Sequence, residues 1–95
     1  MRSLRGLDEA AALQQDDFAS LLAELSPVQA RVLRLLAAGP VEHPNASDFV
    51  AEARATARSV TLALSVLDDS GLALRRGRAW IVPNPFLRHW LAGDG

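Results

Sequence analysis

The stretch TARSVTLALSVLDDSGLALRRGRAWIVP, residues 56–83, changes its hydrophobic spacing once, at Gly71. Before this glycine the apolar residues recur every three or four positions, which predicts a helix with one buried face. The residues on that face are Val60, Ala63, Leu64 and Leu67. Thr56 is a suitable N-cap for this helix, and Gly71 is a suitable residue to end it.

The second half of the stretch predicts two short strands. LALRR (72–76) is expected to form the first, with Leu72 and Leu74 on one side, and AWIVP (79–83) the second. The Arg76-Gly77-Arg78 run between them predicts a tight turn. An isolated β-hairpin is only marginally stable, so this one is expected to pack against the helices.

The residues before Thr56 predict another, shorter helix. Asn45 is its candidate N-cap, and Asp48 follows three residues later. Its apolar residues are Phe49, Val50 and Ala53, and the helical pattern breaks at Arg54 and Ala55. The short helix, the break and the longer helix form a helix-turn-helix, which the hairpin extends to a winged helix. The predicted fold class is therefore mainly α with a small β-hairpin.

SPVQARVLRLLAAGP (26–40) predicts a helix upstream of the helix-turn-helix. Ser26 suits the N-cap, Pro27 the first helical position, and Gly39 the end. The expected buried stripe consists of Val28, Val32, Leu35 and Leu36. A loop, VEHP (41–44), is expected to follow.

The chain also predicts a helix near each end. The first runs from about Leu7 to Leu25, and Asn84 with Pro85 would start the last. Phe86 and Trp90 are expected to contact the first helix near Phe18, Leu21 or Leu22. This apolar surface either completes one core or forms half of a dimer interface. Its assigned members are Leu4, Leu7, Ala11, Phe18, Phe86 and Trp90.

Length and composition predict a single domain with no covalent cross-links. Of the 95 residues, 49% are hydrophobic and 22% charged, which is typical of a globular chain. The absence of cysteine excludes disulfides and cysteine-based zinc sites. No apolar run is long enough for a membrane span or a signal peptide, so a cytoplasmic location is expected. The expected divisions are an N-terminal helical extension (1–17), a winged-helix core (26–82) and a C-terminal helix (84–92).

The chain resembles the C-terminal winged-helix domain of archaeal-type AAA (STAND-like) ATPases over about residues 18–92. The segments that carry the resemblance are LSPVQARVLRLLAAG, NASDFVAEA, ARSVTLALSVLDDSGLALRR and AWIVPNPFLRHWL. The family's motif positions are held by Leu25-Ser26-Pro27 with Gln29, Asp48-Phe49, Ser59-Val60 with Ala63-Leu64, and Pro85-Phe86 with Trp90-Leu91. The resemblance implies a non-catalytic accessory domain that contacts DNA or protein.

Two departures from the family pattern stand out. Family members carry an ATPase module with a phosphate-binding loop upstream, whereas this sequence has no such motif and no lysine. ATP binding through that type of site is therefore not expected, and the chain is an excised domain, a fragment or a stand-alone descendant. Asn84 stands where the family has aspartate before the proline, and both residues cap helices.

No pattern in the sequence points to catalysis. His43 and His89 fall in different elements, and a metal site needs more ligands than either position offers. No nucleophile motif marks the serines. Neither an enzyme activity nor a cofactor or metal is expected.

The second half of the chain predicts a small basic surface for double-stranded DNA. Residues 1–50 carry a net charge of −3 and residues 51–95 a net charge of +2. The candidate nucleic-acid contacts are Arg54, Arg58, Ser59, Thr61, Ser65, Arg75, Arg76 and Arg78. So few phosphate contacts predict weak, salt-dependent binding. A homodimer would double the number of these contacts.

Leu62 argues against DNA reading, because it falls where a DNA reader usually has a polar side chain. Two functions remain open on the sequence. The first is an accessory binding module for DNA or for a protein such as an ATPase module. The second is a stand-alone, dimeric winged-helix transcription regulator.

Overall fold

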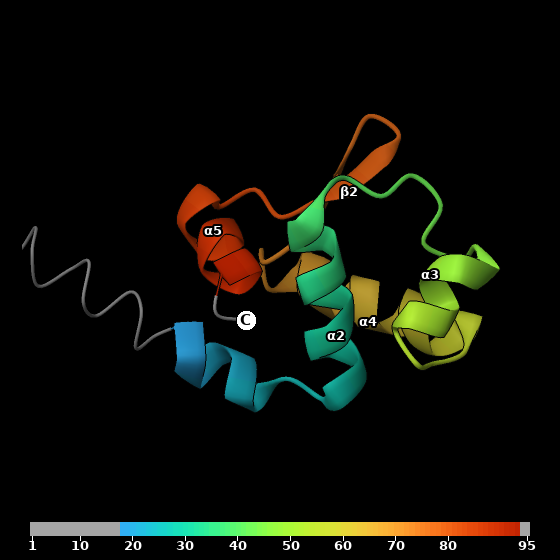
Figure 1. The fold of residues 1–95 in the computed structure, drawn as a ribbon, viewed down its shortest axis with the longest axis horizontal. Coiled ribbons are helices and arrows are strands. Elements are labelled where there is room, and N and C mark those ends of the chain that lie inside the picture. The colour runs from blue at the N-terminus through green and yellow to red at the C-terminus, as the bar shows by residue number, and fades with distance from the viewer. Residues whose placement is uncertain (1–17, 94–95) are drawn as a thin grey trace, which may run out of the picture.

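The computed structural model describes residues 18–93, which are mainly helical with one antiparallel hairpin (Figure 1). Residues 18–24 form a helical segment at the start of this part of the chain. The elements that follow are α2 (Pro27–Ala38), α3 (Ser47–Glu52), α4 (Ala57–Asp69), β1 (Leu74–Arg76), β2 (Ala79–Ile81) and α5 (Pro85–Gly93). This order confirms the predicted winged helix-turn-helix.

Helix α2 begins where the sequence predicts. The Ser26 hydroxyl accepts the Gln29 N–H at 3.2 Å, and the Gln29 side chain accepts the Ser26 N–H at 3.0 Å. This reciprocal pair satisfies two backbone donors that a helix start otherwise leaves without partners. Pro27 occupies the first turn, and the helix ends at Gly39 as expected.

The buried face of α2 is wider than the predicted stripe and rotated from it. Val32 and Leu36 are buried as expected, but Val28 and Leu35 are only half-buried. Leu33 and Ala37 are buried in their place. The reason is that α2 lies at the centre of the molecule and packs against both α4 and α5 (Figure 1). A helix with neighbours on two sides buries more than the single stripe of a surface helix.

The helix-turn-helix consists of α3, a tight turn and α4. Thr56 caps α4 by accepting the Ser59 N–H at 3.1 Å, which confirms the predicted start of this helix. The predicted N-cap of α3 is wrong: Ala46 occupies that position and makes no side-chain bond to the helix. Asn45 instead accepts a hydrogen bond from the Thr61 hydroxyl at 3.1 Å. Its side chain therefore ties the loop before α3 to α4.

The buried face of α4 is the one that the sequence predicts. Val60, Ala63, Leu64 and Leu67 are at most 5% exposed. The helix is followed by Gly71 in a left-handed conformation, with φ of 78°, as expected of a glycine that terminates a helix.

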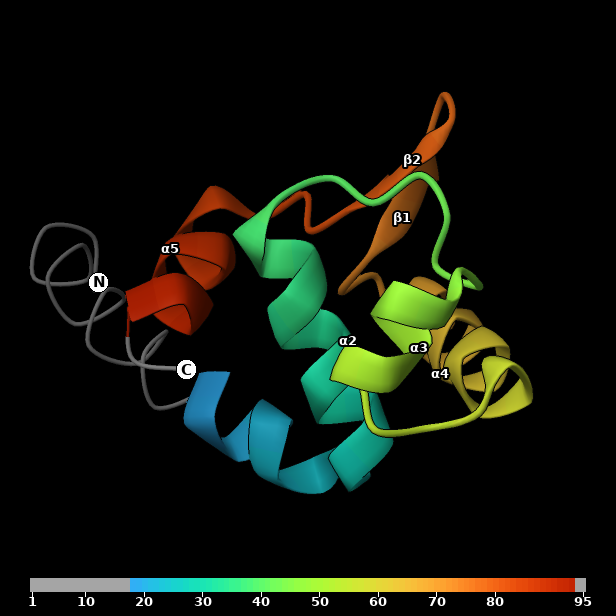
Figure 2. The ribbon, with the colours of Figure 1, turned by 45° about the vertical axis from the view of Figure 1, so that its right-hand side comes forward.

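The hairpin is shorter than predicted, and Val41, from the chain before α3, pairs with its second strand. β1 begins at Leu74 rather than Leu72, and Ala73, between them, is fully buried. Arg76 pairs with Ala79, so Gly77 and Arg78 form the turn. The predicted loop at VEHP is wrong at its first residue. Val41 pairs with Trp80 through two backbone hydrogen bonds of 3.0 and 2.8 Å, and the hairpin thereby joins the chain before α3 (Figure 2).

Helix α5 folds back over the core, and of the two aromatic residues predicted to make the contact only Trp90 does so. Asn84 caps it as expected, accepting the N–H groups of Phe86 and Leu87 at 2.9 and 3.2 Å. The Trp90 ring packs on Phe18 with centroids 5.8 Å apart, as predicted. Phe86 does not contribute, because it is 65% exposed.

Leu87 and Leu91 fill the position expected for Phe86. They are 3% and 4% exposed, respectively. Successive residues of a helix point about 100° apart, so burying Leu87 turns Phe86 away from the core. Leu4, Leu7, Ala11 and the first part of the predicted N-terminal helix lie outside the described residues.

Candidate binding face

The exposed face of α4 lies opposite its core residues. Arg58, Thr61, Leu62 and Ser65 are exposed there. Leu62 is 56% exposed, and Val66, one turn later, is 39% exposed. An apolar pair thus occupies a central part of the helix face that a helix-turn-helix presents to a ligand.

Two of the predicted contact residues are engaged within the domain. Ser59 is half-buried, and its hydroxyl accepts a hydrogen bond from the Thr56 hydroxyl at 3.0 Å. The Thr61 hydroxyl lies within hydrogen-bonding distance of both Asn45 Oδ1 and the Ala57 carbonyl, at 3.1 and 3.0 Å. Since a hydroxyl has one proton, Thr61 has no further donor to offer a ligand while these bonds persist.

The turn between α3 and α4 is held by a residue that the sequence did not single out. Arg31 of α2 donates from Nε to the Ala53 carbonyl at 2.6 Å and from Nη2 to the Arg54 carbonyl at 3.5 Å. Arg54 itself has a left-handed backbone, with φ of 54°, and an exposed side chain. No helical or motif pattern marks Arg31, because its partners are backbone atoms more than twenty positions away.

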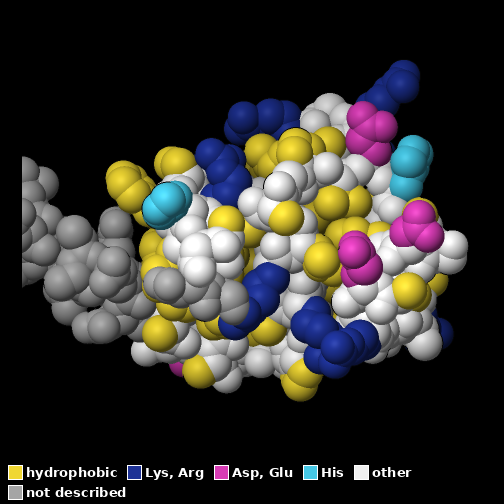
Figure 3. Space-filling model, viewed as in Figure 1, with side chains coloured by type: hydrophobic (Ala, Val, Ile, Leu, Met, Phe, Trp, Pro, Cys, Tyr) yellow, Lys and Arg dark blue, Asp and Glu magenta, His cyan; other side chains and the backbone are white. Residues whose placement is uncertain are grey.

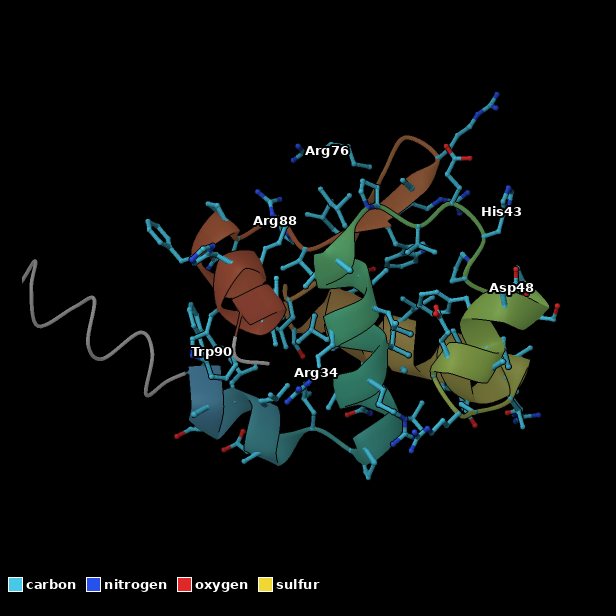
Figure 4. The ribbon with its side chains drawn as sticks, in the orientation of Figure 1. Arg34, His43, Asp48, Arg76, Arg88 and Trp90 are labelled. Atoms are coloured by element: carbon cyan, nitrogen blue, oxygen red, sulfur yellow. The ribbon has the colours of Figure 1, made fainter. Side chains whose placement is uncertain are left out.

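The hairpin, or wing, places three exposed arginines beyond the helices. Arg75 and Arg76 lie at the end of β1, and Arg78 lies in the turn. Figure 4 shows Arg76 at the side of the molecule where the hairpin lies, with Arg88 of α5 nearby and Trp90 at the far end of α5. In Figure 3 arginine side chains gather around the hairpin, while acidic side chains and a histidine mark the neighbouring loop and α3.

A groove of about 870 Å³ separates α4 from the wing. We call it the wing groove. One wall is the loop at residues 42–46, a second is α4, and the third is the hairpin. Its lining includes Glu42, Leu64, Asp68, Arg75 and Trp80. No sequence pattern predicts this groove, because its three walls are brought together by long-range contacts: the pairing of Val41 with Trp80 and the bond between Thr61 and Asn45.

The model of one protein family, described as a probable winged helix domain, matches residues 16–93. The chain belongs to this winged-helix family. The match spans the helix-turn-helix, the wing and α5. No curated protein and no solved structure matches the chain.

Winged helix domains bind DNA or proteins and are typically non-catalytic. Among residues 18–93 of this winged helix, no group of three or more His, Cys, Asp or Glu side chains is placed to hold a metal ion. In the same part of the chain, no helix combines the length and apolar character needed to cross a membrane. His43 and His89 are both exposed and line different hollows, His43 between the loop before α3 and the hairpin and His89 between α5 and the end of α2.

Proposed function

We propose that this winged helix is a non-catalytic binding module whose α4 face contacts a protein partner. The observation that carries the proposal is the exposure of Leu62, which is 56% accessible near the middle of that face. In a DNA-reading helix this position faces base edges, which are distinguished mainly by hydrogen bonds. Leucine offers none, and Thr61 beside it is already bonded within the domain.

The surroundings of Leu62 support a protein partner. Leu62 borders a shallow hollow of about 210 Å³ between α4 and the start of α2, where Val28 also contributes. Val66 continues the apolar surface along α4, and Arg58 lies one turn before Leu62. Apolar residues at the centre with arginine nearby are typical of protein interfaces.

The resemblance to the C-terminal domain of archaeal-type AAA (STAND-like) ATPases supports an ATPase module as the partner. In that family the winged helix accompanies such a module. The motif residues that carry the resemblance include Ser26 and Gln29 at the start of α2, and both line the same shallow hollow as Leu62. The proposed interface therefore overlaps part of the motif.

Site-directed photo-crosslinking tests this proposal directly. Leu62→p-benzoyl-phenylalanine is expected to capture a protein in cells that produce the chain, and mass spectrometry would identify it. Ala51→p-benzoyl-phenylalanine, at an exposed position of α3, is the matched control. Adducts to nucleic acid at position 62, no adduct there, or equal adducts at both positions would contradict a protein interface on α4.

Duplex DNA is the second candidate ligand, and it is favoured by one observation. Arg54, Arg58, Arg75, Arg76 and Arg78 are all exposed along the turn, α4 and the wing. The alternative function that these residues support is a stand-alone, dimeric transcription regulator. Ser65, also exposed, could add a phosphate or base contact, whereas the bonded hydroxyls of Ser59 and Thr61 are weaker candidates.

A further inference from the structure

We propose that the wing groove accepts an arginine or lysine side chain from an extended segment of the partner protein. This inference rests on the proposed function and specifies the chemistry of the partner. It assigns a role to Trp80, Glu42 and Asp68, none of which belongs to the apolar surface around Leu62.

The wing groove is formed by walls that are fastened to one another. Trp80 is fixed at its backbone by the two hydrogen bonds to Val41. The loop is bonded to α4 through Asn45 and Thr61. Pro44, which lies between Val41 and Asn45 in this loop, is buried. A groove whose walls are already ordered loses little conformational entropy when a ligand enters.

The apolar lining of the groove includes a tryptophan. Trp80 is half-buried and lines the groove together with Leu64, which is 5% exposed. An indole ring attracts a cation to its face, and tryptophan does so more strongly than the other aromatic residues. Arginine and lysine also bring apolar side-chain stems that can lie along such a lining.

The charges around the groove favour a cation. Glu42 contributes a carboxylate from the loop and Asp68 another from α4, and both residues are exposed. Each carboxylate can accept a charge-assisted hydrogen bond from a guanidinium or ammonium group. Arg75 is the only arginine of the lining, so two negative charges and one positive charge leave the lining with a formal charge of −1.

The same two carboxylates disfavour a nucleic-acid strand in this groove. A duplex that took α4 into its major groove and the wing along its flank would bring phosphates toward the space between them. Glu42 and Asp68 would repel these phosphates, since like charges brought together in a partly desolvated site cost free energy. A basic peptide is attracted by both carboxylates and repelled only by Arg75 among the charged residues of the lining.

The two tryptophans allow the inference to be tested within one spectrum. Trp80 lines the wing groove, whereas Trp90, which belongs to α5, packs on Phe18 and serves as an internal control. The probe is a short acetylated and amidated peptide of Gly, Ser and Arg, added to the full chain. We expect it to shift the indole N–H resonance of Trp80 in a proton–nitrogen correlation spectrum and to leave that of Trp90 in place.

Two sets of controls isolate the charge. Replacing arginine by citrulline keeps the shape of the peptide but removes its charge, and is expected to weaken binding by about fivefold. Glu42→Gln and Asp68→Asn are expected to weaken the arginine peptide similarly, whereas Glu52→Gln, at an exposed acid of α3 outside the groove, is expected to have no effect. An unchanged Trp90 resonance shows that each variant remains folded.

Three outcomes would overturn the inference. The first is a Trp80 resonance that does not shift when the arginine peptide is added. The second is a citrulline peptide that binds as tightly as the arginine peptide. The third is a Trp80 shift produced by duplex DNA but not by the arginine peptide. The first two leave a protein adduct at position 62 possible, so failure of the groove is distinguishable from failure of the proposed function. Conversely, a peptide-induced shift at Trp80 without any adduct at position 62 would support peptide binding in the wing groove and contradict a protein interface on α4.

Discussion

Arg31 on α2 donates its Nε–H to the carbonyl oxygen of Ala53, with the two atoms 2.6 Å apart. The bond joins the central helix to the end of α3 and fixes the turn from which α4 starts. A cationic donor is well placed there, because helix C-termini carry a partial negative charge. Arg31 is thus a positioning residue for the binding face, and its guanidinium is bonded to two backbone carbonyls of the turn.

The first prediction concerns this bond. Arg31→Ala is expected to lower the free energy of unfolding by about 1–3 kcal/mol, because it removes a charged donor and leaves the carbonyls of Ala53 and Arg54 without that partner. Urea denaturation would measure the change. Arg34→Ala is the control on the same helix; Arg34 is exposed, so we expect an effect within about 0.5 kcal/mol. Equal losses in both variants would show that the bond to Ala53 contributes nothing.

The two aromatic residues of α5 are expected to respond differently to truncation. Trp90→Ala removes the contact with Phe18 and, because Trp90 is only half-buried, should cost about 3 kcal/mol, at the lower end of the range for buried tryptophan. Phe86→Ala should cost less than about 0.5 kcal/mol, since Phe86 is 65% exposed. Thermal or urea unfolding of the two variants measures both changes in the free energy of unfolding. A large loss in Phe86→Ala would mean that this side chain is covered in solution.

Gly77 is expected to be required for its backbone conformation alone. Its φ is 65°, and a β-carbon added there would meet no atom within 4 Å. Gly77→Ala should therefore destabilise the wing by about 1–2 kcal/mol through the left-handed backbone and not through a clash. Gly39 offers a matched control, because its φ of 166° is extended and its surroundings are also open. Gly39→Ala should be neutral or slightly stabilising; a similar loss at both glycines would refute the conformational explanation.

The DNA alternative makes a prediction about salt. If the exposed arginines bind a duplex, the logarithm of affinity should fall with the logarithm of salt concentration with a slope of no more than about 4 or 5, one unit for each phosphate neutralised. Arg58→Ala and Arg76→Ala should each reduce that slope by about 1. Fluorescence anisotropy at several salt concentrations measures it. No binding at low salt, or binding insensitive to salt, would exclude this function.

The dimeric alternative depends on the exposed side of α5. If Phe86 lies in a dimer interface, sedimentation equilibrium should detect a dimer and Phe86→Glu should convert it to a monomer without changing the monomer fold. Ala92→Glu, at another exposed position of α5, is the control. A monomer at high micromolar concentration in the unaltered chain would remove the dimeric regulator from consideration.

The sequence predicted those elements whose signals are local. Ser26, Thr56 and Asn84 were identified as caps because a capping side chain bonds to backbone only two or three residues away. Val60, Ala63, Leu64 and Leu67 were identified as core because one helical period relates them. The hairpin followed from the change of period at Gly71.

Most of the errors involve contacts between distant parts of the chain. Asn45 bonds to Thr61 instead of capping α3, and that choice depends on where α4 lies. The buried face of α2 could not be drawn correctly without knowing that α4 and α5 flank it. The wing groove was missed for the same reason: Glu42, Asp68 and Trp80 belong to three elements, and each alone has the pattern of an ordinary surface or strand residue.

The pairing of Val41 with Trp80 has a consequence for how the domain assembles. β1 and β2 are neighbours in sequence, so their hairpin can form early and at small entropic cost. Val41 can join it only after the chain through α3 and α4 has turned back to the wing, which is a long-range closure. We therefore expect the pairing of Val41 with Trp80 to form after the helix-turn-helix has folded. Protection of the Val41 and Trp80 amide hydrogens from exchange should appear together, and last.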